Sequence, residues 1–141
     1  MKDLSDLNYF LGVQVVRTSQ DIFLTQQKYV HDLVHKFHMH TAKLVRTSSF
    51  SLTFLTLTDG ELLADPIEYG SMVGALQYLT ITRPNIAYSV HVVLQFMHAR
   101  RTTHLDAAKC IFRYLQGILN FSLQFHPASS PSIIVAYSDA D

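Results

Sequence analysis

The sequence has only one cysteine, four prolines and five glycines among its 141 residues. Because Cys110 has no second cysteine to pair with, an intrachain disulfide and a multi-thiolate metal site are both excluded. No apolar run reaches the roughly 18 residues that a membrane-spanning helix needs, and the chain opens with the charged residues Lys2 and Asp3. These absences predict an intracellular, reducing location without a membrane contact.

The chain also lacks net charge, since 11 basic residues balance 11 acidic ones. Hydrophobic residues make up 48% of the sequence and charged residues 16%, which is typical of a globular domain. The charges are unevenly distributed. Residues 47–82 contain four acids and no Lys or Arg, whereas residues 83–113 contain five bases and one acid. Such asymmetry places a basic side on a neutral protein and favours a polyanionic partner.

Two types of apolar spacing predict an α+β fold. In residues 8–24, apolar side chains at alternate positions on both sides of a polar turn predict a β-hairpin. Residues 25–37 and about 103–116 have the three- and four-residue spacing of amphipathic helices, and Thr25 is the expected N-cap of the first. Residues 121–125 and 133–137 read as strands. Residues 47–58 alternate as a strand would, yet we expect a linker there.

A helix over residues 66–81 is the strongest local prediction. Asp65 is a good N-cap, Pro66 fits the first helical position, and Glu68 completes a capping-box arrangement. Arg83-Pro84 ends this helix, and Pro84 begins the next one. A buried stripe is expected on one face, formed by Tyr69, Met72, Val73, Leu76 and Leu79. Gly70, Gly74 and Tyr78 lie four residues apart on another face. Because glycine weakens a helix by about 0.5–1 kcal/mol relative to alanine, this face predicts the close approach of a partner.

The same region resembles a known family. Residues 73–85 resemble the Val-Gly-x-Leu-x-Tyr-Leu-Thr-x-Thr-Arg-Pro-Asp signature of copia-type retrotransposon Pol polyproteins. Further motifs match in order along the whole chain, among them Tyr-Phe-Leu-Gly-Val at 9–13, Leu-Thr-Gln-Gln-Lys-Tyr at 24–29 and Tyr-Ser-Asp-Ala-Asp at 137–141. The chain therefore looks like a Pol fragment, from the thumb and connection region of the reverse transcriptase to the start of ribonuclease H.

The resemblance implies three regions and a nucleic-acid partner. Residues 1–24 would form a primer-grip-like hairpin, residues 25–117 a thumb-like bundle of about four helices, and residues 118–141 strands leading into a truncated ribonuclease H domain. In the parent, the chain would bind the RNA/DNA primer–template duplex. The residues implied in that binding are Phe10, Leu11 and Gly12 in the hairpin, Gly70, Gly74, Gln77 and Tyr78 on the helix, and Arg83, Arg100, Arg101, Lys109 and Arg113 as phosphate contacts.

The resemblance also implies that catalysis lies elsewhere. Asp139 matches the first ribonuclease H carboxylate, but two-metal cleavage needs several acids around both ions. The polymerase motif of the family contains paired Asp residues, and no two Asp residues are adjacent in this sequence. We therefore expect a non-catalytic segment that holds no Mg²⁺ of its own, although the parent enzyme would use Mg²⁺.

Two other functions stay open. The glycine face could pack against a protein, which would make the chain a helical protein–protein interaction module. His31, His35 and His38 fall at i, i+4 and i+7 with His40 nearby, a spacing compatible with a helical zinc site. We favour a solvent-exposed histidine face over that site. The chain also departs from the family pattern, because Gly70 and Gln116 stand where basic residues are usual; this is typical of a drifted copy.

Overall fold

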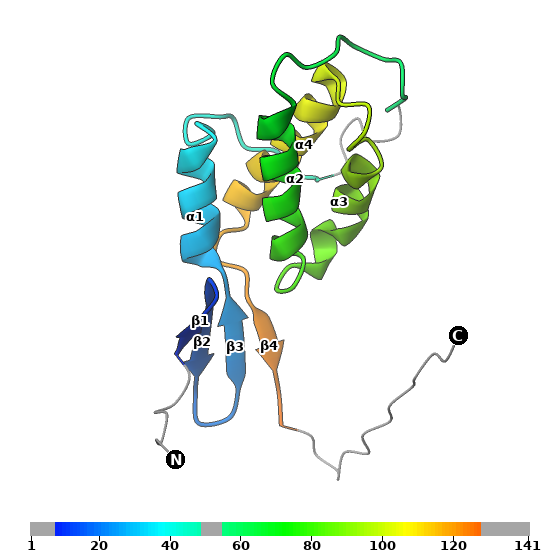
Figure 1. The fold of residues 1–141 in the computed structure, drawn as a ribbon. Coiled ribbons are helices and arrows are strands. Elements are labelled where there is room, and N and C mark those ends of the chain that lie inside the picture. Colours follow the sequence, from blue (N-terminus) through cyan, green and yellow to red (C-terminus); the bar gives the residue numbers. More distant parts are fainter. Residues whose placement is uncertain (1–7, 49–54, 128–141) are drawn as a thin grey trace, which may run out of the picture.

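The computed structural model describes residues 8–48 and 55–127, which form a helical bundle with a small sheet at one end (Figure 1). The strands are β1 (Tyr9–Phe10), β2 (Val13–Arg17), β3 (Ile22–Thr25) and β4 (Leu123–Phe125). The helices are α1 (Gln27–Lys36), α2 (Pro66–Leu79), the short 3-10 helix η2 (Pro84–Ile86), α3 (Ala87–Leu94) and α4 (Thr102–Gly117). The predicted α+β class is confirmed. Within these described ranges, no helix is both long and apolar enough to cross a membrane.

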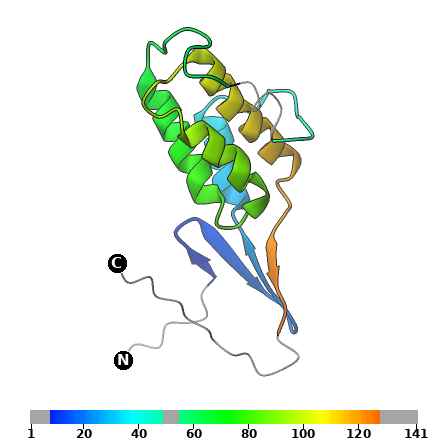
Figure 2. The same cartoon turned by 90° about the vertical axis from the view of Figure 1, so that its right-hand side faces the viewer.

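The sheet joins the two ends of the described chain. Its four strands are antiparallel in the order β1-β2-β3-β4. The last strand pairs with β3, placing Leu123 opposite Leu24 and Phe125 opposite Ile22. Figure 2 shows this sheet extending away from the helices. The first strand of the predicted C-terminal segment therefore belongs to the same sheet as the N-terminal strands.

The N-terminal hairpin differs from the prediction, because the expected first strand is broken in the middle. Leu11 and Gly12 have φ values of 48° and 83° and form a two-residue turn between β1 and β2. Positive φ at both central residues is what a type I′ hairpin turn requires, and Asn-Gly is its usual sequence. A leucine in the first turn position continues the apolar alternation, so spacing alone gave no sign of this turn.

Helix α2 follows its sequence signals. The Asp65 carboxylate accepts a hydrogen bond from the Ile67 amide at 2.8 Å, and Pro66 occupies the first turn. All five residues of the predicted stripe are fully buried. The helix ends at Leu79, two residues before the predicted end. At α1 the N-cap is Gln26 rather than Thr25, although the Thr25 hydroxyl accepts a bond from the Gln27 amide at 3.3 Å.

Helix α4 is the centre of the bundle, since it packs against α1, α2 and α3. Its buried side includes Ile111, Phe112 and Leu115, and the Phe112 ring lies 5.4 Å from the ring of Phe37. Side chains from all four α-helices form one continuous core. The core thus fixes where α2 stands relative to the other helices.

Three buried polar residues occupy the corner where the bundle meets the sheet. The Thr82 hydroxyl donates to the Gln26 side-chain oxygen at 2.6 Å. Arg83 is only 2% exposed, and its Nη1 and Nη2 atoms donate to the carbonyls of Ile118 (2.6 Å) and Leu119 (2.9 Å). Those carbonyls lie where the chain leaves α4 for β4. A buried guanidinium is stable only when hydrogen-bonded, and carbonyls at a helix C-terminus favour a cation.

We predict that Arg83→Met destabilises the protein by about 2–4 kcal/mol, because two hydrogen bonds from a charged group are lost and their carbonyls are left unpaired. Urea unfolding would measure this loss. Arg113→Met serves as a control, since Arg113 is half-buried and its Nε donates to the Lys43 carbonyl nearer the surface. Equal losses for the two variants would contradict the special role of Arg83.

A second prediction concerns alkaline pH. Burial raises the pKa of Tyr69 from 10.0 to about 12, with Arg100 acting in the opposite direction, and the Tyr69 hydroxyl donates to the Val93 carbonyl at 2.6 Å. The folded state therefore keeps the proton that the unfolded chain loses near pH 10. This contribution is complete below pH 10 and is lost as the pH rises towards 12, in total about 2–3 kcal/mol. Unfolding of Tyr69→Phe should show a weaker decline over pH 9.5–11.5; identical pH slopes would contradict the assignment.

Candidate nucleic-acid interface

Most of the basic residues at positions 83–113 form hydrogen bonds to the protein's own backbone. Arg83 was expected to contact phosphate, but its guanidinium is buried and bonded to carbonyls, so this expectation is wrong. Arg100 donates to the carbonyls of Met97 and Pro66 at 2.6 and 2.7 Å. Arg113 donates to a carbonyl as well, while Lys109 is half-buried on α4. The arginines of this segment are therefore engaged mainly with the protein's own backbone.

Arg101 holds the loop that precedes α2. Its Nε and Nη1 atoms donate to the carbonyls of Leu57 (2.7 Å) and Gly60 (2.8 Å). His104, which the sequence did not single out, is fully buried in the same place: its Nδ1 accepts from the Arg101 amide and its Nε2 lies 2.8 Å from the Thr56 carbonyl. Arg101 is the N-cap of α4, and Arg83 binds the carbonyls just beyond its last residue. The 16 residues of α4, roughly 24 Å in length, therefore separate the two arginines.

The glycine face of α2 divides into a covered part and an open part. A Cβ atom added to Gly70 would lie 3.7 Å from the Met97 side chain and 3.9 Å from Arg100, so Gly70 faces neighbouring residues of the chain. A Cβ atom at Gly74 would meet nothing within 4 Å. Gly74 lines an open concavity of about 320 Å³ with Gln77, Tyr78 and Ile81. Of the two glycines, only Gly74 therefore offers free space.

The hairpin and α2, predicted separately, meet at Tyr78. The Tyr78 hydroxyl donates a hydrogen bond to the Leu11 carbonyl. The Tyr78 ring stands edge-on to the ring of Tyr29, with centroids 5.4 Å apart, and both rings lie 3.7 Å from where a Cβ of Gly12 would be. The spacing places Tyr29 on the apolar side of the helix predicted at residues 25–37, but it carries no sign of a partner on α2.

We call the residues around this junction the hairpin–helix surface, defined as Leu11, Gly74, Gln77, Tyr78 and Ile81. Leu11 is 70% exposed and Ile81 is 55% exposed. Phe10, the last residue of β1, precedes Leu11 and is also exposed. The surface is mostly apolar, and Gln77 contributes the one side-chain amide.

The histidine face is arranged differently from the prediction. Helix α1 ends at Lys36, and His38 lies beyond it with a φ of 55°, so His38 does not continue the helical row. The rings of His31 and His35 are 4.5 Å apart, and His40 instead stacks on His35 at 5.0 Å. Across residues 8–48 and 55–127, no group of three His, Cys, Asp or Glu side chains is arranged to hold a metal ion.

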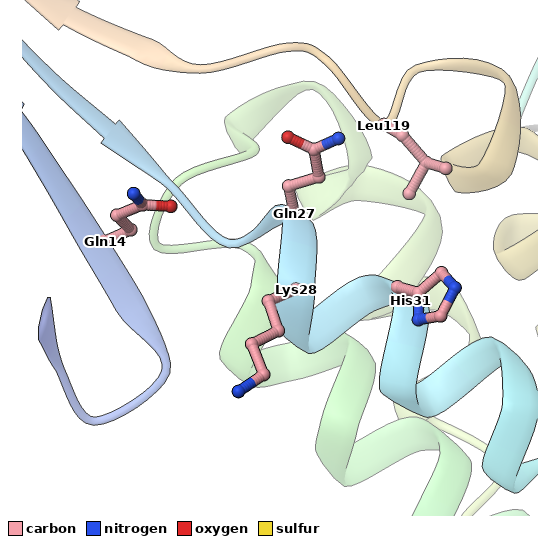
Figure 3. A pocket seen from close by; sticks show the side chains of 5 residues that line it. All are labelled: Gln14, Gln27, Lys28, His31 and Leu119. Carbon is pink, nitrogen blue, oxygen red and sulfur yellow. The ribbon is translucent and has the colours of Figure 1, made fainter.

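A second concavity, of about 290 Å³, lies between β2 and the start of α1 (Figure 3). Its lining includes Gln14, Gln27, Lys28 and His31. The Gln27 side-chain nitrogen already donates to Asn120 at 3.3 Å. Figure 3 shows the Lys28 ammonium pointing away from Gln27 and His31. These polar ends do not converge on one point, so this concavity has no built binding site.

The remaining predicted positions, Asp139 and the strand at 133–137, lie outside the described residues.

Relatives of known class match the chain along its whole length. It is 43% identical over 141 residues to the retrovirus-related Pol polyprotein from transposon RE1 of Arabidopsis thaliana. It is 36% identical over 151 aligned residues to the Pol polyprotein from transposon TNT 1-94 of Nicotiana tabacum. The chain belongs to the copia-type Pol polyproteins. It spans about a tenth of the length of these Pol relatives.

This Pol segment also has a shorter relative. An uncharacterised mitochondrial protein of Arabidopsis thaliana is 36% identical over 141 residues, which are all of this chain and 58% of that protein. No family model matches the chain, and no solved structure is significantly similar to it.

Proposed function

We propose that this Pol segment forms part of the primer–template binding region of a reverse transcriptase and is not itself catalytic. The observation that carries the proposal is the hairpin–helix surface, in which the turn at Leu11–Gly12 and the open face of α2 meet at Tyr78. The resemblance named the hairpin and the helix as two separate duplex contacts. Their junction in space gives both contacts one continuous surface.

The shape and chemistry of this surface suit a nucleic-acid backbone. Gly74 leaves room for a sugar to approach the helix. A Cβ there would meet nothing within 4 Å, so packing inside the protein does not account for the glycine. Leu11, Tyr78 and Ile81 supply apolar contact, and Gln77 supplies one donor and one acceptor. Such contacts recognise the shape of a duplex rather than its sequence, as a polymerase that copies any template needs.

Electrostatic attraction contributes little in this proposal, because the arginines of residues 83–113 donate to main-chain carbonyls. We expect the segment to bind an RNA/DNA hybrid weakly and to form about two phosphate contacts or fewer, which corresponds to a slope in log affinity against log salt shallower than about −2. Fluorescence anisotropy of a labelled hybrid from 25 to 200 mM salt would measure the slope. A steep slope would place the binding on a basic surface elsewhere, and no binding at 25 mM would contradict the proposal.

Substitutions at Gly74 distinguish duplex binding from a simple structural role. Gly74→Ala should stabilise the protein by about 0.5–1 kcal/mol, because alanine favours the helix and meets no neighbour. Gly74→Leu should also keep or raise stability, yet it should reduce hybrid affinity several-fold by filling the concavity. Comparing the two variants in urea unfolding and in the anisotropy assay separates helix propensity from bulk. Unchanged affinity in Gly74→Leu would exclude this surface as the duplex contact.

The alternative function is a protein–protein interaction module. The apolar character of the hairpin–helix surface favours it, as Leu11 and Ile81 are both exposed. The Gly74 variants also test this reading. A parent chain that fails to bind hybrid at low salt, with its stability raised by Gly74→Leu, would leave a protein partner as the better explanation of the open face.

For the non-catalytic part of the proposal, we expect no nucleotide incorporation on a primed template with Mg²⁺ or Mn²⁺. Polymerase metals need paired carboxylates, and the sequence contains no adjacent Asp residues. The assay compares purified protein with a blank from a mock purification. Activity above the blank that follows the protein through a second purification would overturn this part.

A further inference from the structure

The turn between β1 and β2 has little to stabilise it locally. Leu11 has a positive φ, which is unfavourable for a bulky side chain and is common only for glycine and asparagine. Strand β1 contains only two residues and lies at the edge of the four-stranded sheet, where it pairs with β2 alone. Both Phe10 and Leu11 are more exposed than buried, so little apolar burial compensates. The position of this turn must therefore come from contacts with the helices.

Tyr78 provides the directional contact. Its hydroxyl donates to the carbonyl of Leu11 itself, the strained residue, and its ring packs with Tyr29 beneath Gly12. A Cβ at Gly12 would make ordinary van der Waals contact with both rings, so the turn lies directly on them, and the φ of 83° is the reason for a glycine there. Tyr78 also lines the concavity beside Gly74, one helical turn away. A single side chain thus contacts both the turn and the open face of α2.

We propose that Tyr78 is a positioning residue: its hydroxyl fixes the Leu11–Gly12 turn against α2 and so holds the two halves of the duplex-binding surface in one arrangement. This inference rests on the proposed function for its link to binding. It assigns the hydroxyl to the protein's own backbone rather than to the nucleic acid. The Tyr29 ring is the passive part of the platform, since it supports the turn through packing.

The experiment removes the hydroxyl alone. In Tyr78→Phe, the ring platform stays and the bond to Leu11 is lost, whereas Tyr29→Phe removes a hydroxyl from the other ring and leaves that bond in place. Hydrogen exchange of the Val15 amide, which donates to the Asn8 carbonyl at 2.9 Å, reports opening of the hairpin. The Leu63 amide, bonded to Arg100 in the distant loop, is the internal reference. We expect Tyr78→Phe to speed Val15 exchange about three- to tenfold, with no change at Leu63 and none in Tyr29→Phe.

A rescue variant strengthens the test. Leu11→Asn gives the turn the favoured Asn-Gly sequence, so the hairpin needs the tyrosine less. The double variant Tyr78→Phe with Leu11→Asn should recover most of the Val15 protection. A loss of protection caused by damage to α2 would not be recovered in this way.

Hybrid binding completes the design. Tyr78→Phe should weaken hybrid affinity several-fold, and Tyr29→Phe should leave it unchanged. Unchanged Val15 exchange in Tyr78→Phe would overturn the inference, as would faster exchange with full hybrid affinity. If the parent binds no hybrid while Tyr78→Phe still speeds Val15 exchange, the positioning role stands and the proposed function fails.

Discussion

The buried guanidinium of Arg83 is the contact on which the arrangement of sheet and bundle depends. It binds the Ile118 and Leu119 carbonyls, where the chain leaves α4 for β4. Its neighbour Thr82 bonds to Gln26, where β3 passes into α1. The paired strands β3 and β4 are thus both fixed to the end of α2 at one corner. Desolvation lowers the pKa of Arg83, and the Tyr114 side chain acts in the opposite direction. These contacts therefore fix the position of the hairpin relative to Tyr78.

The other arginines of the segment act in a similar way at other places. Arg100 binds the first residue of α2 and the end of the α3 region, and Arg101 ties the preceding loop to the start of α4. A guanidinium carries several N–H donors in a rigid plane, so one side chain can satisfy carbonyls from separate segments. The four arginines in residues 83–113 therefore all have a structural role. In the proposed function, these four arginines therefore contribute little charge to nucleic-acid binding.

Local features were predictable and non-local ones were not. The buried stripe of α2 and its Asp65 cap follow from spacing and from chemistry within one helical turn, and the structure confirms both. The break at Leu11–Gly12 was missed because leucine continues the apolar alternation through the turn. The pairing of β4 with β3 joins segments about 100 residues apart, which no local pattern encodes. Burial of Arg83 was missed because a charged side chain is ordinarily expected at the surface. For the site, the sequence named Tyr78 and Gly74, but it did not reveal that Tyr29 supports the same turn.

The arginine contacts have an evolutionary consequence. Each one is made to a main-chain carbonyl, at Ile118, Leu119, Leu57, Gly60, Pro66, Met97 or Lys43. A carbonyl is present whatever side chain the residue carries, so most of these partner positions are free to change without losing the bond. Gly60 is an exception, because a Cβ there would lie 2.7 Å from the Thr102 hydroxyl. Substitution at most of these partner positions therefore leaves the arginine contact in place, whereas substitution of the arginine removes it.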